Sequence, residues 1–206
     1  MSYPPVLDLD GYTDVPTGHI ATVVTYLEMH APPRAAAPDG VEGAGLTRLT
    51  ARDEARYTAI FRTLGERWVW FSRLELTVQQ RAAIIGDRDV EAYALTLGGV
   101  DAGLLEIDFR KKGEAELAFF GLYESAVGKG VGRWLMARAL ERAWARKSVK
   151  RLFVHTCTLD HPRALDFYRK SGFKPCKTML EVTPDPRLRG VLPRSAAPHV
   201  PIIEGA

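Results

Sequence analysis

Short runs of apolar and β-branched residues along this chain are separated by loops and by helical repeats of apolar positions. Residues 19–29 (HIATVVTYLEM) are rich in β-branched side chains, which predicts a strand. Proline, alanine and glycine dominate residues 30–43, which predicts a loop. Apolar positions at helical spacing predict helices over residues 50–64 and 77–85. The first part of the chain therefore predicts one strand followed by two helices.

Three strand-like runs follow in the middle of the chain, at residues 90–97, 100–110 and 114–123. They are separated by Gly98-Gly99 and by the stretch Lys111–Gly113, both of which are typical of tight hairpin turns. We therefore expect an antiparallel meander.

The pattern then returns to alternating helices and strands. Apolar residues recur at helical spacing at positions 135, 136, 139, 140 and 143, and residues 151–159 form a strand-like run. A helix over residues 161–171 and a strand over residues 173–182 complete the pattern. A strand–helix–strand unit implies a right-handed crossover and a parallel pair. We predict an α/β fold of the α+β kind, with a mixed, mostly antiparallel sheet that contains a central parallel strand pair and is flanked by helices.

Composition and charge give no support for a membrane protein or a nucleic-acid-binding protein, but they do not identify the function. The chain has 206 residues and a formal net charge of +3, which gives no argument for nucleic-acid or membrane binding. No apolar run approaches the roughly 18 residues of a transmembrane helix, and the N-terminal stretch has no signal-peptide pattern. Cys157 and Cys176 have neither a disulfide framework nor metal-ligand spacing. We expect a cytoplasmic protein that uses no metal.

The stretch VGKGVGRWL, residues 127–135, places three glycines immediately before a helix. Glycine destabilises a helix by about 1 kcal/mol relative to alanine, so three glycines at the start of a helix require a structural or functional explanation. Free backbone N–H groups and the helix dipole make a helix N-terminus an anion site, and Lys129 and Arg133 add positive charge. The spacing matches neither a Walker loop nor a Rossmann turn. The alternative is a flexible turn before a solvated basic helix.

Two segments resemble one family. VGKGVGRWLMARAL resembles the acetyl-CoA pyrophosphate loop, Q/R-x-x-G-x-G/A, of the GNAT superfamily of N-acetyltransferases. HPRALDFYRKSGF, residues 161–173, is similar to that family's N-x-x-A-x-x-x-Y-x-x-x-G-F segment. The resemblance covers residues 90–181 in the right order and implies a GNAT-like fold that uses acetyl-CoA as co-substrate, without a metal.

The resemblance implies a set of coenzyme-binding residues and two departures from the family pattern. Val127 replaces the usual leading Gln or Arg, and His161 replaces the usual Asn. We therefore expect the pyrophosphate to rest on backbone amides and on Lys129 and Arg133. The implied coenzyme-binding residues are Phe120, Gly121, Leu122, Tyr123, Val127, Gly128, Lys129, Gly130, Val131, Gly132, Arg133, His161, Ala164 and Phe167.

The implied reaction needs a donor for the developing oxyanion, a base and an acid. The resemblance points to the Leu122 amide as donor and to Tyr168 as the acid for the thiolate of coenzyme A. Gly121 favours a bulge or a close backbone approach at that point. The resemblance also implies the base, because histone-type members of the family place a glutamate six residues before the position of Leu122, and that residue is Glu116 here. Strict alternation places residues 116, 118, 120 and 122 on one face, although a bulge at Gly121 would disturb the last of these. Glu106 on the neighbouring strand and a chain of waters are the alternatives.

The acceptor side has fewer signals. His155, Trp68 and Trp70 are candidates for lining an acceptor site, while core packing is the alternative for both tryptophans. Cys157 lacks an orienting partner and is expected to be an inert thiol. Asp160 is expected to cap the following helix.

These observations lead to a domain plan and three functional hypotheses. We expect one domain at residues 1–183, with a variable acceptor-side region at 31–85 and a coenzyme-binding core at 90–181. The proline-rich extension at 184–206 is expected to be extended and to lie on the surface, on a neighbouring subunit or over the active site. The protein could also form a homodimer.

The main hypothesis is an N-acetyltransferase that acts on a primary amine of a small molecule or peptide by direct attack. A non-catalytic acyl-CoA sensor is the alternative, and nucleic-acid binding through the basic helix ranks below both.

Overall fold

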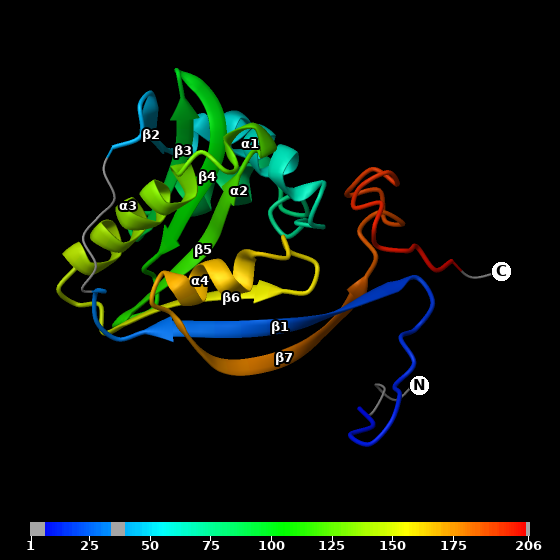
Figure 1. Ribbon diagram of the computed structural model, residues 1–206. Helices are drawn as coiled ribbons and strands as arrows, with labels where there is room; N and C mark the ends of the chain where they lie inside the picture. The colour runs from blue at the N-terminus through cyan, green and yellow to red at the C-terminus, as the bar shows by residue number, and fades with distance from the viewer. Residues whose placement is uncertain (1–6, 34–39, 205–206) are drawn as a thin grey trace.

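A seven-stranded sheet in the order β2-β3-β4-β5-β6-β1-β7 lies at the centre of the computed structural model, which describes residues 7–33 and 40–204 (Figure 1). Residues 1–6 and 205–206 of the expected domain and extension, and residues 34–39 of the expected loop, lie outside the described residues. The strands are β1 (His19–Met29), β2 (Ala44–Leu49), β3 (Val90–Leu97), β4 (Val100–Asp108), β5 (Glu114–Leu122), β6 (Arg151–Cys157) and β7 (Lys174–Pro184). The main helices are α1 (Glu54–Gly65), α2 (Val78–Ile85), α3 (Val131–Ala145) and α4 (Ala164–Lys170).

The pairing of the strands confirms the predicted fold class. All neighbouring strands are antiparallel except β5 and β6, which pair in parallel. The meander β3-β4-β5 is confirmed. Its first turn uses Gly98 and Gly99, both with positive φ, as a tight hairpin requires. A helical crossover through α3 joins β5 to β6, as the strand–helix–strand pattern predicted.

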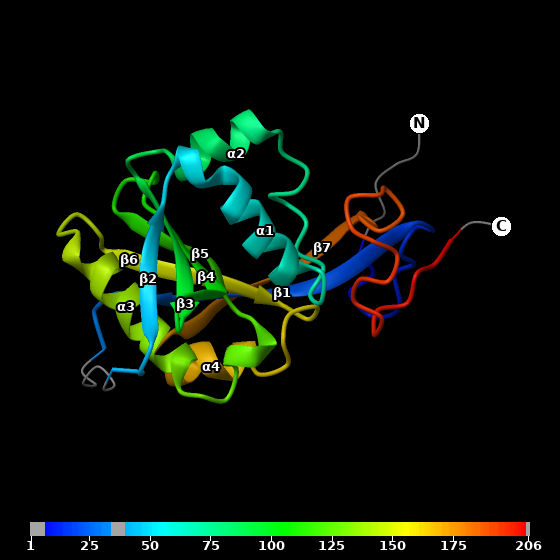
Figure 2. The same cartoon turned by 90° about the horizontal axis from the view of Figure 1, so that it is seen from above.

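Helices cover both faces of the sheet. Helices α3 and α4 lie on one face, and α1 and α2 lie on the other (Figures 1 and 2). Leu105 and Leu117 belong to the core under α3 and α4, whereas Leu104 belongs to the core under α1. Because successive residues of a strand point to opposite faces, these clusters show which face each position of β4 and β5 serves.

Two local features differ from the expectations. Strand β2 was not predicted, because its sequence AGLTRL is short and has no clear alternation. Helix α4 begins at Ala164 rather than at residue 161, and Arg163 is its N-cap. The expectation that Asp160 caps this helix is therefore wrong.

The C-terminal segment after β7 folds back on the chain instead of remaining extended. The buried Arg187 side chain pairs with Asp185 at 2.7 Å and donates hydrogen bonds to the carbonyl oxygens of Ala196, Ala197 and Val200. Ala197 also donates its backbone N–H to the carbonyl oxygen of Glu66. The segment therefore lies against the loop that follows α1. No helix of the described residues is long and apolar enough to cross a membrane.

Candidate functional site

A pocket of about 590 Å³ opens where β5 and β6 separate. These strands pair only from Glu114 to Glu116 and from Arg151 to Phe153, and they diverge beyond that point. The pocket extends through the gap between these two strands and is lined by residues from both faces of the sheet. On the face of α3 and α4, the helix-side half of the pocket is lined by Phe120, Leu122, α4 and part of the glycine loop (residues 127–132), namely residues 127, 128, 130 and 132. On the opposite face, the β1-side half is lined by alternate residues of β1, the aromatic loop (residues 68–71), His155 and Glu181.

A β-bulge in β5 changes which of its side chains share a face. Glu106 pairs with Phe119 and Ile107 pairs with Leu117, so Ala118 is an extra residue on β5. Phe120 and Leu122 then face α3 and α4, whereas Phe119 faces α1. Residue 116 lies on the same face as residues 119 and 121. The expectation that residues 116, 118, 120 and 122 share a face is wrong.

Gly121 makes room for a tryptophan. A Cβ atom on Gly121 would lie 3.1 Å from the Trp70 ring and 3.2 Å from the Leu64 side chain. The absence of a side chain at Gly121 therefore allows a close approach, as expected for a strand glycine. The group that approaches is the Trp70 ring. The bulge is three residues earlier, at Ala118.

The glycine loop presents its backbone to the pocket. Gly128 and Gly130 have φ values of 83° and 80°, which non-glycine residues rarely adopt. Gly130 is the N-cap of α3 and has no side chain to satisfy the helix N-terminus. Among the described residues, no acceptor takes the amide protons of residues 128–130. The loop is therefore a set of backbone donors at the positive end of a helix.

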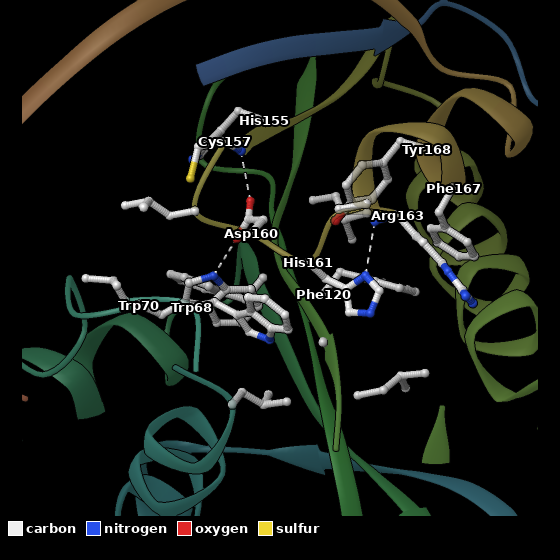
Figure 3. A pocket seen from close by; sticks show the side chains of 18 of the residues that line it. Trp68, Trp70, Phe120, His155, Cys157, Asp160, His161, Arg163, Phe167 and Tyr168 are labelled. Carbon is white, nitrogen blue, oxygen red and sulfur yellow. Dashed lines mark hydrogen bonds between the residues drawn. The ribbon is translucent and has the colours of Figure 1, made fainter. Parts of the chain in front are cut away.

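Aromatic rings form the wall of the helix-side half. The Phe120 ring stacks on Phe167 at 5.6 Å and packs edge-on against Tyr168 at 6.3 Å. His161 accepts a hydrogen bond at Nδ1 from the backbone N–H of Arg163, which holds its ring at the entrance to α4 (Figure 3). This half therefore offers an apolar channel that leads from the glycine loop toward the strand opening.

Tyr168 directs its hydroxyl toward the middle of the pocket (Figure 3). Burial, together with the negative charge of Asp160, raises the pKa of the Tyr168 phenol well above its ordinary value. The phenol therefore stays protonated at neutral pH and is available as a proton donor.

Asp160 connects the aromatic loop to the end of β6 through hydrogen bonds. Its carboxylate accepts hydrogen bonds from Trp70 Nε1 at 2.8 Å and from the Cys157 backbone N–H at 2.9 Å (Figure 3). It also accepts one from the Thr156 hydroxyl at 2.7 Å. The same residue that was expected to cap α4 thus fixes the aromatic loop against the end of β6.

His155 lines the pocket and has Glu116 behind it. The Glu116 carboxylate lies 3.3 Å from His155 Nδ1, and the Tyr26 ring lies 5.2 Å from the imidazole. The interaction with Glu116 outweighs partial burial and raises the pKa of His155 above its ordinary value of 6.5. This pair places a titratable nitrogen at the pocket surface.

The structure brings most of the expected site residues to this pocket, although it leaves their roles untested. Glu116, Tyr123, Lys129 and Val131 do not line it. Glu106 does not line it either: its fully buried carboxylate pairs with Arg73 at 2.6 Å and accepts a hydrogen bond from Tyr57. The expected residues that line the pocket are Trp68, Trp70, Phe120, Gly121, Leu122, Val127, Gly128, Gly130, Gly132, Arg133, His155, His161, Ala164, Phe167 and Tyr168.

Cys157 also lines the pocket. Burial and the nearby Asp160 raise the pKa of its thiol, so little thiolate forms at neutral pH. Among the residues that the structure describes, no group of three or more His, Cys, Asp or Glu side chains could hold a metal ion.

Several pocket residues were missed by sequence reasoning. Alternation along β1 identifies one face of that strand, but nothing in the sequence places the face beside β6 and the aromatic loop. The missed residues include Ile20, Thr22, Val24, Phe71, Arg163, Glu181 and Thr183.

Solved structures share this fold. A GCN5-related N-acetyltransferase from Kribbella flavida aligns with a TM-score of 0.57 and 18% identity, over 84% of this chain and 63% of that one. A similar protein from Sphaerobacter thermophilus aligns with a TM-score of 0.53 and 17% identity, over 82% and 52% of the two chains. The chain thus spans less than two thirds of the length of these relatives.

A smaller relative aligns as well. An aminoglycoside acetyltransferase from an uncultured soil metagenomic sample, solved with sisomicin, has a TM-score of 0.52 and 16% identity, over 63% of this chain and 88% of that one. No curated protein matches the chain. The family model described as the acetyltransferase (GNAT) family matches residues 57–173, which is more than half of the chain. The fold, the glycine loop before α3 and this match together show that the chain belongs to the acetyltransferase (GNAT) family.

Proposed function

We propose that the protein is an N-acetyltransferase that transfers the acetyl group of acetyl-CoA to a primary amine by direct attack. The observation that carries this proposal is the pocket between β5 and β6. It joins backbone donors at a helix N-terminus to a histidine–glutamate pair on the opposite face of the sheet. When bound, acetyl-CoA supplies the acetyl group as a reactive thioester.

The residues of the helix-side half fit this coenzyme. The amide protons of residues 128–130 and the dipole of α3 suit the anionic pyrophosphate, and Arg133 and Arg163 line the same half. The exposed Val127 side chain takes no part in this charge interaction. The apolar channel beside Phe120 and Phe167 suits an extended pantetheine arm.

The end of β5 supplies an oxyanion donor. The Tyr123 N–H donates to the carbonyl oxygen of Ala102 in β4. Because successive N–H groups of a strand point to opposite edges, the Leu122 N–H points toward the open side, away from β4. It can donate to the carbonyl oxygen as negative charge develops there.

His155 acts as the base in this proposal, and Glu116 positions it. The carboxylate beside Nδ1 favours the tautomer that carries its proton there, which leaves Nε2 to accept a proton from the acceptor ammonium. The uncharged amine can then form the bond to the acetyl carbon. Glu116, which does not line the pocket, does not need to touch the amine.

Tyr168 acts as the acid. The carbon–sulfur bond breaks, its electron pair leaves with the sulfur, and the Tyr168 phenol gives its proton to that sulfur. The phenolate then takes the second proton that the attacking nitrogen loses as the amide forms, which restores the phenol. The phenol carries this proton at neutral pH because even its ordinary pKa of about 10 lies well above neutrality.

Two measurements test this proposal. Isothermal calorimetry with acetyl-CoA and coenzyme A is expected to show binding, and a panel of amines is expected to yield acetylated products by mass spectrometry. A lack of coenzyme binding at millimolar ligand would refute the proposal.

A second function, an acyl-CoA-binding sensor, is favoured by the two departures at Val127 and His161. Coenzyme binding without acetylation of any amine, peptide or aminoglycoside in the panel would support the sensor and exclude the transferase.

A further inference from the structure

We propose that the acceptor is a small primary amine whose ammonium group is carried on an apolar or aromatic body that bears no acidic group. This inference rests on the proposed acetyl transfer and names its substrate class. Three features of the β1-side half support it: the distribution of charge, one carboxylate without a partner and a fixed aromatic wall.

Charge is divided between the two halves of the pocket. Arg133 and Arg163 line the helix-side half, where an anionic coenzyme fits. The described residues that line the β1-side half include the carboxylates of Asp160 and Glu181 but no lysine or arginine. Arg67, beside the Trp68 ring, is already paired with Glu124 at 2.6 Å. The β1-side half therefore favours a cation and disfavours an anion.

The two carboxylates differ in their partners. Asp160 accepts three hydrogen bonds, from Trp70, Thr156 and Cys157. Glu181 has no hydrogen bond or ion pair among the described residues, although it lines the same pocket as His155, with β1 between their two strands. Its negative charge contributes to the raised pKa values of both His155 and Tyr26. Glu181 is therefore the group that can hold an ammonium close to His155.

The opposite wall is apolar and aromatic. Ile20 and Val24 of β1 and Phe71 of the aromatic loop line the pocket together with Trp68 and Trp70. Such side chains are favourable partners for an aliphatic or aromatic body, and an aromatic face also attracts an ammonium group. Thr22, between Ile20 and Val24, already forms a hydrogen bond with the Thr158 hydroxyl at 2.8 Å, so this wall suits an apolar body better than one rich in hydroxyl groups.

Packing around Val69 holds the aromatic wall in place. Val69 has a φ of 58°, which is strained for a β-branched residue. It is buried in one cluster with Ile20 and with Ala197 of the C-terminal segment. Strained residues persist only where surrounding structure holds them, so the C-terminal segment supports a preformed wall.

Matched amines test the substrate class. With saturating acetyl-CoA, we expect kcat/KM for 2-phenylethylamine to exceed that for L-phenylalanine by about ten-fold or more, because one extra carboxylate would lie beside Glu181. L-phenylalanine amide adds similar bulk without the charge and should recover most of the loss. Sisomicin and a lysine-containing peptide should react more slowly than 2-phenylethylamine. Equal or faster turnover of L-phenylalanine, sisomicin or the peptide would overturn the inference.

A variant tests the ammonium contact. Glu181→Gln should raise KM for 2-phenylethylamine about five- to ten-fold and leave KM for acetyl-CoA unchanged. Glu141→Gln, which makes the same change on the outer surface of α3, should alter neither value. An unchanged KM in Glu181→Gln would show that this carboxylate does not bind the amine.

Binding measured without turnover separates this inference from the proposed function. Quenching of tryptophan fluorescence by 2-phenylethylamine, in the presence of coenzyme A, should be lost or reduced in Trp68→Leu. If acetyl-CoA binds but 2-phenylethylamine neither binds nor reacts, the inference fails while coenzyme binding stands. If acetyl-CoA itself does not bind, the proposed function fails.

Discussion

The Glu116 carboxylate lies 3.3 Å from His155 Nδ1, and only the histidine reaches the pocket surface. The two residues come from different strands, β5 and β6, at the point where those strands begin to diverge. In the proposed mechanism the imidazole at the pocket surface accepts the proton, and the carboxylate behind it sets the tautomer of the imidazole.

The first prediction concerns pH. His155 must be neutral to accept a proton, and Glu116 raises its pKa above 6.5. We therefore expect kcat/KM to rise with pH through an apparent pKa above 6.5. Glu116→Gln removes the charge that favours the imidazolium, so the acid limb of the profile should move to lower pH. Profiles for the two proteins check this; superimposable acid limbs would remove Glu116 from the mechanism.

The second prediction concerns Tyr168. Its hydroxyl has no hydrogen bond to any of the described residues, so Tyr168→Phe should leave the protein folded. Loss of the acid should lower kcat about 100-fold, with little change in affinity for acetyl-CoA. Thiol release and calorimetry measure the two effects. Tyr12→Phe, at a fully exposed side chain outside the pocket, serves as the control, and full activity in Tyr168→Phe would exclude the acid role.

The third prediction concerns the glycine loop. Gly130 adopts a φ of 80°, a region that Asp and Asn tolerate better than most other residues. Gly130→Asp places a carboxylate at the backbone donors and should abolish coenzyme binding without unfolding the protein. Gly130→Asn has the same shape without the charge and should bind more tightly than Gly130→Asp. Calorimetry compares them; unchanged affinity in Gly130→Asp would mean that the pyrophosphate binds elsewhere.

The fourth prediction concerns Gly121 and Trp70. A methyl group on Gly121 would lie 3.1 Å from the Trp70 ring, so Gly121→Ala should destabilise the fold by about 1–3 kcal/mol. The same substitution should cost less in a Trp70→Phe background, because the smaller ring leaves space. Chemical unfolding of the four proteins gives the coupling energy. Additive effects would show that the two residues do not constrain each other.

The fifth prediction concerns the C-terminal segment. Arg187→Met leaves the buried Asp185 carboxylate without its partner and should lower the free energy of unfolding by about 3 kcal/mol or more. Arg189→Met removes an exposed pair with Glu75 and should cost about 1 kcal/mol or less. Urea unfolding distinguishes them. Equal, small losses would mean that the segment contributes little to the fold.

Much of the fold was predictable because it depends on local patterns. The meander follows from hairpin glycines, and α3 follows from apolar residues at helical spacing. The glycine loop was predictable for the same reason, since its positive-φ glycines and the helix start are adjacent in the chain. Strand β2 was missed because a six-residue edge strand leaves little periodic signal.

The β1-side half of the pocket depends on contacts that no local pattern reveals. Trp70 and Asp160 are 90 residues apart and meet through one hydrogen bond. Glu181 reaches the pocket because β7 pairs with β1, and sheet order is not encoded in any single stretch. The relation of Glu116 to His155 was hidden by the bulge, since strict alternation assigns Glu116 to the other face.

The extra residue at Ala118 shifts the phase of β5 halfway along its length. Before it, even-numbered side chains such as Glu116 point toward the face that α1 covers; after it, even-numbered side chains such as Phe120 point toward the face of α3 and α4. One strand thereby presents side chains of the same parity to both faces of the sheet. A deletion of that single codon would invert the second half of the strand, so its length constrains the enzyme as strictly as any side chain does.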